Sequence, residues 1–89
     1  ITNPTHFAVA LKYDTMVMNA PMVLAKGVDK AAFRIREVAE EHGIPIIENP
    51  PLARGLYANV GIEEEIDEEH YRAVAEVINY VWKLRGRKG

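Results

Sequence analysis

Large apolar residues occur at every second position near the start of the chain, over residues 6–13. These residues are Phe7, Val9, Leu11 and Tyr13. A period of two is typical of a β-strand, whose side chains point alternately to its two faces. The opposite face carries Ala8 and Ala10, which are small enough to let a helix pack closely. We therefore predict a strand over 6–13 with both of its faces covered.

Three further segments predict a strand, a helix and another strand, in that order. Residues 22–25 form a short apolar run. Residues 30–42 place apolar side chains at helical spacing between Asp29, a candidate N-cap, and Gly43, a candidate C-terminal stop. Residues 44–48 have the composition of a strand. A strand, a helix and a strand with short joints form a βαβ unit, in which the two strands run parallel.

Two more helices are predicted in the second half of the chain. Pro51 suits the first turn of a helix, where its missing N–H costs nothing. Residues 71–84 carry the clearest helical periodicity in the sequence. Their first apolar stripe contains Tyr71, Val74, Ala75, Ile78, Val81 and Trp82. A second apolar stripe lies on nearly the opposite side, so this helix is either sandwiched or offers one side to a partner.

Together these elements predict one α/β domain over residues 1–89. Its sheet would be small and mixed, with about four strands in the full domain, and helices would flank it on both sides. Only Ile1 and Thr2 precede Asn3. We therefore expect residues upstream of Ile1 to supply most of the first strand, and we expect residues 1–3 by themselves to be weakly held.

The composition excludes several classes of function. The chain is 48% hydrophobic and 27% charged, which is ordinary for a globular domain. Its net charge of −2 argues against a nucleic-acid partner, which would require a basic face. No apolar run approaches the roughly 20 residues that cross a bilayer.

The residue types exclude further chemistries. The chain contains no cysteine and no serine, so the usual side-chain nucleophiles are missing. His6, His42 and His70 are the only histidines, and their spacing matches no metal-ligand pattern. No glycine-rich phosphate loop is present either. We therefore expect neither a metal nor a cofactor.

The stretch Asn3-Pro4-Thr5-His6 carries the most specific chemistry. An asparagine is usually attacked by the amide nitrogen of the next residue, but proline has no N–H and closes that route. The remaining route is attack by the Asn3 side-chain nitrogen on its own backbone carbonyl carbon, which would cut the Asn3–Pro4 bond. A tight turn could hold the reacting groups in place, and backbone N–H groups could stabilise the oxyanion.

In this hypothesis His6 relays a proton to the leaving nitrogen of Pro4, and Thr5 gives at most an orienting hydrogen bond. Asn-Pro pairs also commonly start turns that have no chemistry. From these four residues alone, a structural turn and a self-cleaving bond both stay open.

A second candidate site is a shallow apolar pocket. Ala20 and Pro21 could form one wall of it, and Ala75 and Ile78 of the last helix another. A pocket of this kind suits a weak, transient contact with an apolar side chain. The alternative is that Ala20 and Pro21 only mark the start of a strand, where a residue without an N–H is tolerated.

Longer stretches resemble a known family. They are ITNPTHFAVALKYD, APMVLAKG, AAFRIREVAEEHGIPIIENPPLARGLY and YRAVAEVINYVWKL, in this order. Over essentially the whole chain they resemble the cytoplasmic C-terminal domain of the FlhB/YscU family of type III export-gate proteins. ALKYD, PPLARGLY and AVAEVINYVW favour its flagellar branch over the virulence-secretion branch.

The resemblance implies a membrane protein whose membrane helices are absent from this chain. It implies that the domain lies at the cytoplasmic face of the bacterial inner membrane and cleaves itself once between Asn3 and Pro4, without being a turnover enzyme. Cleavage would let the export apparatus change from rod and hook proteins to filament proteins, and the two pieces would stay in one sheet. The implied partners are other export-gate proteins, the hook-length control protein and the export substrates.

Two alternatives to a self-cleaving switch remain. The first is a non-catalytic docking module that binds export substrates through the pocket of Ala20, Pro21, Ala75 and Ile78. The second is a small nucleotide- or RNA-binding α/β domain, which the negative net charge and the missing phosphate loop disfavour.

Overall fold

The computed structural model describes residues 1–4 and 6–86. It contains β1 (Thr2–Asn3), β2 (Phe7–Lys12), β3 (Met22–Val28), α1 (Lys30–Glu41), α2 (Pro50–Asn59), the 3₁₀ helix η1 (Glu68–His70) and α3 (Tyr71–Leu84). The strands form an antiparallel sheet in the order β1-β2-β3. The α/β class, the small sheet and the flanking helices are therefore confirmed.

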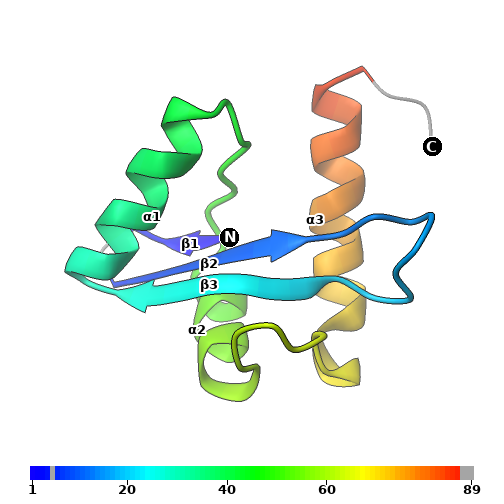
Figure 1. Cartoon of the computed structure of the whole chain (residues 1–89), viewed down its shortest axis with the longest axis horizontal. Coiled ribbons are helices and arrows are strands. Elements are labelled where there is room, and N and C mark those ends of the chain that lie inside the picture. The colour runs from blue at the N-terminus through cyan, green and yellow to red at the C-terminus, as the bar shows by residue number, and fades with distance from the viewer. Residues whose placement is uncertain (5, 87–89) are drawn as a thin grey trace.

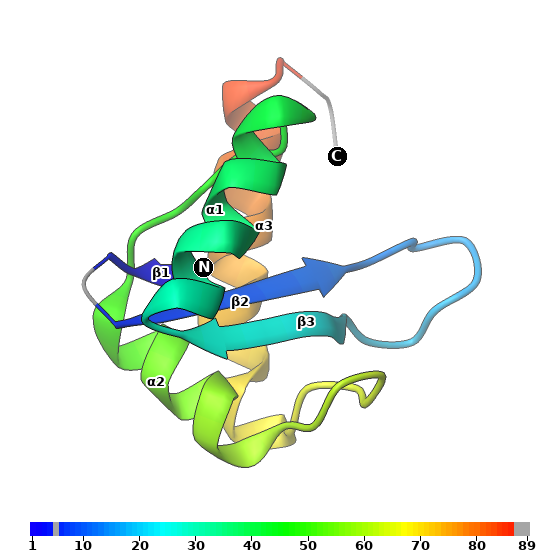
Figure 2. The same ribbon diagram turned by 60° about the vertical axis from the view of Figure 1, so that its left-hand side comes forward.

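The two faces of the sheet are covered by different helices. Helix α1 crosses one face, and α2 and α3 lie behind the other (Figures 1 and 2). The covering follows from the alternation in β2, where Val9 points into the main core and Ala8 to the opposite face. Both side chains are buried. The prediction that both faces of this strand are covered is confirmed.

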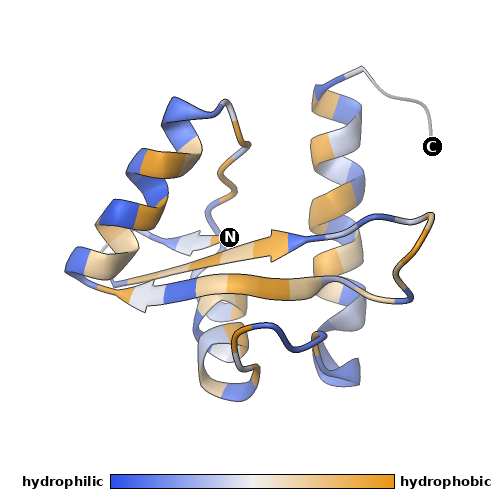
Figure 3. Ribbon diagram, in the orientation of Figure 1, coloured by the Kyte–Doolittle hydropathy of each residue, from blue (hydrophilic) through white to orange (hydrophobic). Residues whose placement is uncertain are grey.

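The main core lies between the sheet and helices α2 and α3. It consists of Val9, Val23, Leu52, Leu56, Val60, Ile66 and Val74. Figure 3 shows apolar positions concentrated along β2 and β3 and recurring as stripes on the helices. Asn49 starts α2 by accepting a hydrogen bond from the Leu52 amide (3.3 Å), and prolines fill the first helical positions. The helix predicted after Pro51 is therefore confirmed.

The opposite face is built from small residues. Ala8 pairs with Gly27 of β3, and α1 packs on this face of the sheet, where Ala8 and Ala32 are both buried. A Cβ added to Gly27 would lie 2.6 Å from the Cβ of Ala31, so only glycine lets α1 approach this closely. Strand β3 continues through Gly27 to Val28, beyond the strand predicted over residues 22–25.

The predicted strand at 44–48 is wrong as a regular strand. Only Glu48 forms a bridge, parallel to Thr2. The Ile47 carbonyl accepts from Thr2 of β1, which is only two residues long, whereas the Ile44 amide donates back to the carbonyl of Ala39 in α1 (2.8 Å). Pro45 also removes one donor. The second strand of the expected βαβ unit is thus reduced to a single parallel bridge, while its helix forms as predicted.

Strand β1 is held on both edges, contrary to the expectation that residues 1–3 are weakly held. Thr2 donates to the carbonyl of Ile47 (2.8 Å) and accepts from the amide of Asn49 (2.8 Å). On the other edge, Val9 donates to the carbonyl of Ile1 (2.9 Å). Thr2 is 5% exposed. The short strand, at the edge of the sheet, therefore lies between β2 and the segment before α2.

Asp29 does not cap α1 as predicted. Its side chain makes no capping hydrogen bond, and its backbone has φ 48°. A positive φ is uncommon for a residue other than glycine. The sharp bend at Asp29 turns the chain from β3 into α1, and the carboxylate faces the turn described below.

Candidate functional site: the β1–β2 turn and an apolar cavity

Strands β1 and β2 are joined by the turn that starts at Asn3. The amide N–H of His6 donates a hydrogen bond to the carbonyl oxygen of Asn3 (2.9 Å), which closes a four-residue β-turn. This carbonyl belongs to the Asn3–Pro4 peptide, the bond predicted to break. Asn3 is half-buried at the end of β1, and Pro4 and His6 are exposed. Thr5, the remaining predicted site residue of the turn, lies outside the described residues.

Asp29 lies beside His6. Its amide donates to the carbonyl of His6 (2.8 Å), and its Oδ1 lies 3.7 Å from His6 Nδ1. Both side chains are mostly exposed, at 64% for His6 and 74% for Asp29, so this ion pair is weak. The sequence interpretation missed this contact because it assigned Asp29 to the helix cap.

Helix α1 also reaches the turn. Nη1 of Arg36 donates a hydrogen bond to the carbonyl oxygen of Pro4 (2.8 Å). The guanidinium carbon lies 6.0 Å from the ring centroid of Phe33, one helical turn earlier. Phe33 is 56% exposed and had no role in the sequence interpretation. Arg36 of α1 and Asp29, which directly precedes α1, therefore both contact the turn. The local sequence pattern revealed neither contact.

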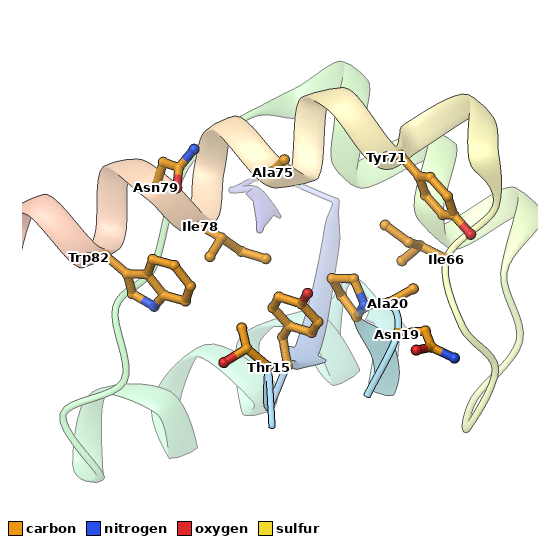
Figure 4. Close-up of a pocket in the computed structure, with 11 residues that line it drawn as sticks. Thr15, Asn19, Ala20, Ile66, Tyr71, Ala75, Ile78, Asn79 and Trp82 are labelled. Atoms are coloured by element: carbon orange, nitrogen blue, oxygen red, sulfur yellow. The ribbon is translucent and has the colours of Figure 1, made fainter. Parts of the chain in front are cut away.

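The four residues of the predicted pocket do line one cavity. Ala20 and Pro21 lie just before β3, and Ala75 and Ile78 belong to α3, which forms the facing wall (Figure 4). The cavity has a volume of about 410 Å³. Its remaining lining residues are Tyr13, Thr15, Asn19, Ile66, Tyr71, Asn79 and Trp82. The sequence interpretation found the two facing walls and missed Tyr13 and Trp82.

The shape of the cavity follows from the hydrogen bonds around Pro21. The Ile66 amide donates to the carbonyl of Pro21 (2.9 Å), and Val23 pairs with Glu64 and Glu63. These bonds tie the segment before η1 to the outer edge of β3 and carry α3 across the start of that strand. Apolar walls with a few amides and hydroxyls at the rim can take one apolar side chain of a partner.

A second cavity lies between α1 and α3. Its volume is about 440 Å³, and its walls include Ile35, Ala39, Val77 and Val81. Tyr13, Ile78 and Trp82 line both cavities, so these three side chains form the partition between them.

The histidines do not form a metal centre. Within residues 1–4 and 6–86, no three His, Cys, Asp or Glu side chains are grouped as metal ligands. His70 is bound through Nδ1 to Asp67 Oδ1 (2.6 Å), and its ring packs over Gly55 of α2. This histidine therefore joins η1 to α2 as a structural contact. Among the described residues, no helix is both long and apolar enough to cross a membrane.

Comparison with known proteins places the chain in a family. A model of the FlhB HrpN YscU SpaS Family matches residues 1–81. The chain belongs to this family. It is 51% identical over 85 residues to the flagellar biosynthetic protein FlhB of Bacillus subtilis. The matched region covers 96% of this chain and 24% of the Bacillus subtilis protein. The chain is 52% identical to the protein of the same name from Salmonella typhimurium, with 96% and 22% covered.

The fold of a solved family member agrees with these matches. The crystal structure of the cytoplasmic domain of FlhB from Shewanella putrefaciens superposes with a TM-score of 0.87 at 51% identity, covering 91% of this chain and 68% of that one. The chain spans about a quarter of the length of its FlhB relatives. The family resemblance predicted from the sequence is thereby confirmed.

Proposed function

We propose that this chain is the part of a flagellar export-gate protein that cleaves itself between Asn3 and Pro4. In the reaction, Nδ2 of Asn3 forms a bond to the carbonyl carbon of Asn3, and the bond from that carbon to the nitrogen of Pro4 breaks. The proton lost by Nδ2 is balanced by the proton that the Pro4 nitrogen gains. The first products are a piece ending in a succinimide and a piece beginning with Pro4.

The observation that supports this proposal best is the hydrogen bond from the His6 amide to the Asn3 carbonyl oxygen. When the side-chain nitrogen attacks, negative charge develops on that oxygen. A hydrogen bond to a charged oxygen is roughly twice as strong as one to a neutral oxygen, so this N–H favours the transition state over the ground state. The donor needs no reorganisation, because the turn already directs it to the oxygen.

The His6 imidazole supplies the proton transfer in this proposal. An imidazole can accept and release a proton near neutral pH, and His6 stands three residues from Asn3 across the turn. The Asp29 carboxylate lies beside this imidazole, with its Oδ1 3.7 Å from His6 Nδ1. The reaction runs once per molecule, so the chain is a self-cleaving protein and not a turnover enzyme.

Within the whole protein, this cleavage would serve as a switch in export. We infer that the intact turn accompanies the export of rod and hook proteins, and that the cleaved form permits the export of filament proteins. The partners would be the other export-gate components, the hook-length control protein and the substrates themselves. The domain would act at the cytoplasmic face of the bacterial inner membrane.

The test is an intact-mass time course after the chain is folded from denaturant. We expect residues 4–89 to appear together with a short piece, the two masses summing to the mass of the parent before any water is added. Asn3→Ala should stay whole, because it lacks the attacking nitrogen. Cleavage of Asn3→Ala at the same bond would rule out this mechanism.

A second candidate function, docking of export substrates, rests on the cavity of Ala20, Pro21, Ala75 and Ile78. A hook or rod protein of the same flagellum serves as the probe, and binding is followed by the fluorescence of Trp82, the only tryptophan. Ala75→Gln should weaken binding because it fills the cavity with a polar group. Asn59→Gln, on the exposed end of α2, serves as the control. Unchanged binding of the probe to Ala75→Gln, measured by the same fluorescence, would remove docking as a function.

A further inference from the structure

Arg36 is the residue that joins α1 to the turn at the scissile bond. It lies 32 positions from Pro4 in sequence, and it is partly buried on the side of α1 that faces the turn. Its Nη1 donates to the carbonyl oxygen of Pro4 at 2.8 Å, and its guanidinium lies over the ring of Phe33. Arginine holds such a position well, because its planar group can stack on a ring and donate hydrogen bonds at the same time.

The carbonyl of Pro4 has a special place in this turn. Pro4 is the second of the four turn residues, and the common β-turn types differ mainly in the direction in which that carbonyl points. The turn therefore has two fixed oxygens: that of Asn3, held by the His6 amide, and that of Pro4, held by Arg36. One oxygen lies on the acyl side of the scissile bond and the other on the leaving-group side.

We propose that Arg36 is a positioning residue for the cleavage, which it aids by fixing the leaving group. This inference rests on the proposed self-cleavage and adds to it a residue from α1. As the Asn3–Pro4 bond lengthens, the Pro4 nitrogen must turn its lone pair out of the amide plane to accept a proton. Arg36 restrains Pro4 during this step, so that the nitrogen stays in reach of the proton donor and the carbonyl carbon stays in reach of Asn3 Nδ2.

The experiment compares cleavage rates of matched variants of the 89-residue chain. Each variant is purified in denaturant, folded by dilution to start the reaction, and sampled by intact mass. We expect Arg36→Ala to cleave at least about 10-fold more slowly than the parent, since small losses of alignment are costly in intramolecular reactions. Arg36→Lys, which keeps one charged donor, should cleave at a rate between those of Arg36→Ala and the parent. Arg34→Ala removes the same charge from the same helix, where Arg34 pairs with Glu37 at 3.5 Å, and should cleave at the parental rate.

Two further measurements separate positioning from stability. Urea denaturation shows whether Arg36→Ala is fully folded under the cleavage conditions. Cleavage rates are compared only under conditions in which both the parent and Arg36→Ala are fully folded. Guanidinium ion, added far below denaturing concentrations, should accelerate Arg36→Ala and leave the parent unchanged, because it can occupy the vacated site.

The possible results are distinguishable. A parent that stays whole overturns the proposed self-cleavage, and the role of Arg36 with it. A parent that cleaves while Arg36→Ala cleaves equally fast overturns the role of Arg36 alone. A slow Arg36→Ala that neither lysine nor guanidinium restores also contradicts positioning by this side chain. A slow Arg36→Ala restored by both, beside a parental Arg34→Ala, supports it.

Discussion

At the level of single residues, the environment of β1 combines the bond proposed to break with a firmly held strand. The acyl side of the Asn3–Pro4 bond is anchored on both edges of β1: Thr2 is hydrogen-bonded to Ile47 and Asn49, and Ile1 is hydrogen-bonded to Val9 of β2. An intramolecular reaction gains most when its parts are held close to the reacting geometry before it starts. Anchoring on one side by the sheet and on the other by α1 would provide this for the proposed cleavage.

The amine of Ile1 gives the first prediction. In the 89-residue chain it donates to the carbonyl of Val9 (3.0 Å), and burial lowers its pKa from 8.0 to about 6. The folded state therefore disfavours the charged amine, and the unfolded chain binds more protons between these two values. Stability should rise with pH from about 6 to 8, by about 2–3 kcal/mol in total. Urea denaturation of the uncleaved Asn3→Ala chain across this range measures the effect.

The control for this prediction is the same chain with Ile1 acetylated. Acetylation replaces the amine by an amide that still donates one hydrogen bond and does not titrate. The difference between the two pH profiles isolates the amine from the three histidines. If stability depended on pH in the same way in the acetylated and the free chain, the pH dependence could not be assigned to the Ile1 amine.

At the level of elements, the packing of α1 on the sheet depends on one glycine. A Cβ at Gly27 would meet the Cβ of Ala31 at 2.6 Å and the backbone of Ala31 at 2.9 Å. Because backbone cannot rotate away, Gly27→Ala should push α1 outward and lower the free energy of unfolding by about 1–3 kcal/mol. Urea denaturation measures this loss. The same displacement would move Arg36 away from Pro4, so cleavage should slow in parallel.

Gly55 provides the comparison for Gly27. A Cβ there would meet Nε2 of His70 at 2.5 Å, the far end of a side chain that can rotate. Replacing a helical glycine by alanine gains about 1 kcal/mol of helix propensity, which offsets part of the cost of moving that ring. Gly55→Ala should therefore be destabilised less than Gly27→Ala. The opposite order would mean that α1 adjusts to a methyl group more easily than His70 does.

Periodicity predicted the elements because each depends mainly on its own residues. The alternation of Phe7 to Tyr13 and the helical spacing in 71–84 are local patterns, and both elements formed. The segment 44–48 failed because a strand needs a neighbour, and only Thr2 provides one. The prediction that Asp29 caps α1 is wrong because the backbone conformation of this residue is set by the bend between β3 and α1, which no local pattern encodes.

The candidate sites show the same division. The turn at Asn3 and the two walls of the cavity could be predicted, since they depend on short sequence stretches and on one helix face. The contact of Arg36 with Pro4 could not, because it depends on where α1 crosses the sheet. For the same reason, the sequence did not identify Tyr13 and Trp82 as lining residues of the cavity.

At the level of the whole molecule, the two candidate sites lie apart. The turn between β1 and β2 stands at one end of the sheet, and the loop before Ala20 stands at the other (Figure 1). Strand β2, six residues long, separates them, which corresponds to about 20 Å. A break in the turn therefore changes no contact of the cavity directly. If cleavage changes the class of exported protein, the change must arise from the surface near the turn or from the mobility of the released ends.

This separation makes the last prediction. The cleaved parent and the uncleaved Asn3→Ala chain should bind the same hook or rod protein with dissociation constants within about 2-fold of each other, since no residue of the turn lines the cavity. Trp82 fluorescence measures both constants, and Ala75→Gln should weaken binding equally in both forms. A difference of 10-fold or more between the two forms would mean that two sites are coupled through the sheet, with a coupling free energy of about 1.4 kcal/mol or more. In that case the cavity itself, and not the surface beside the turn, would be the part that cleavage switches.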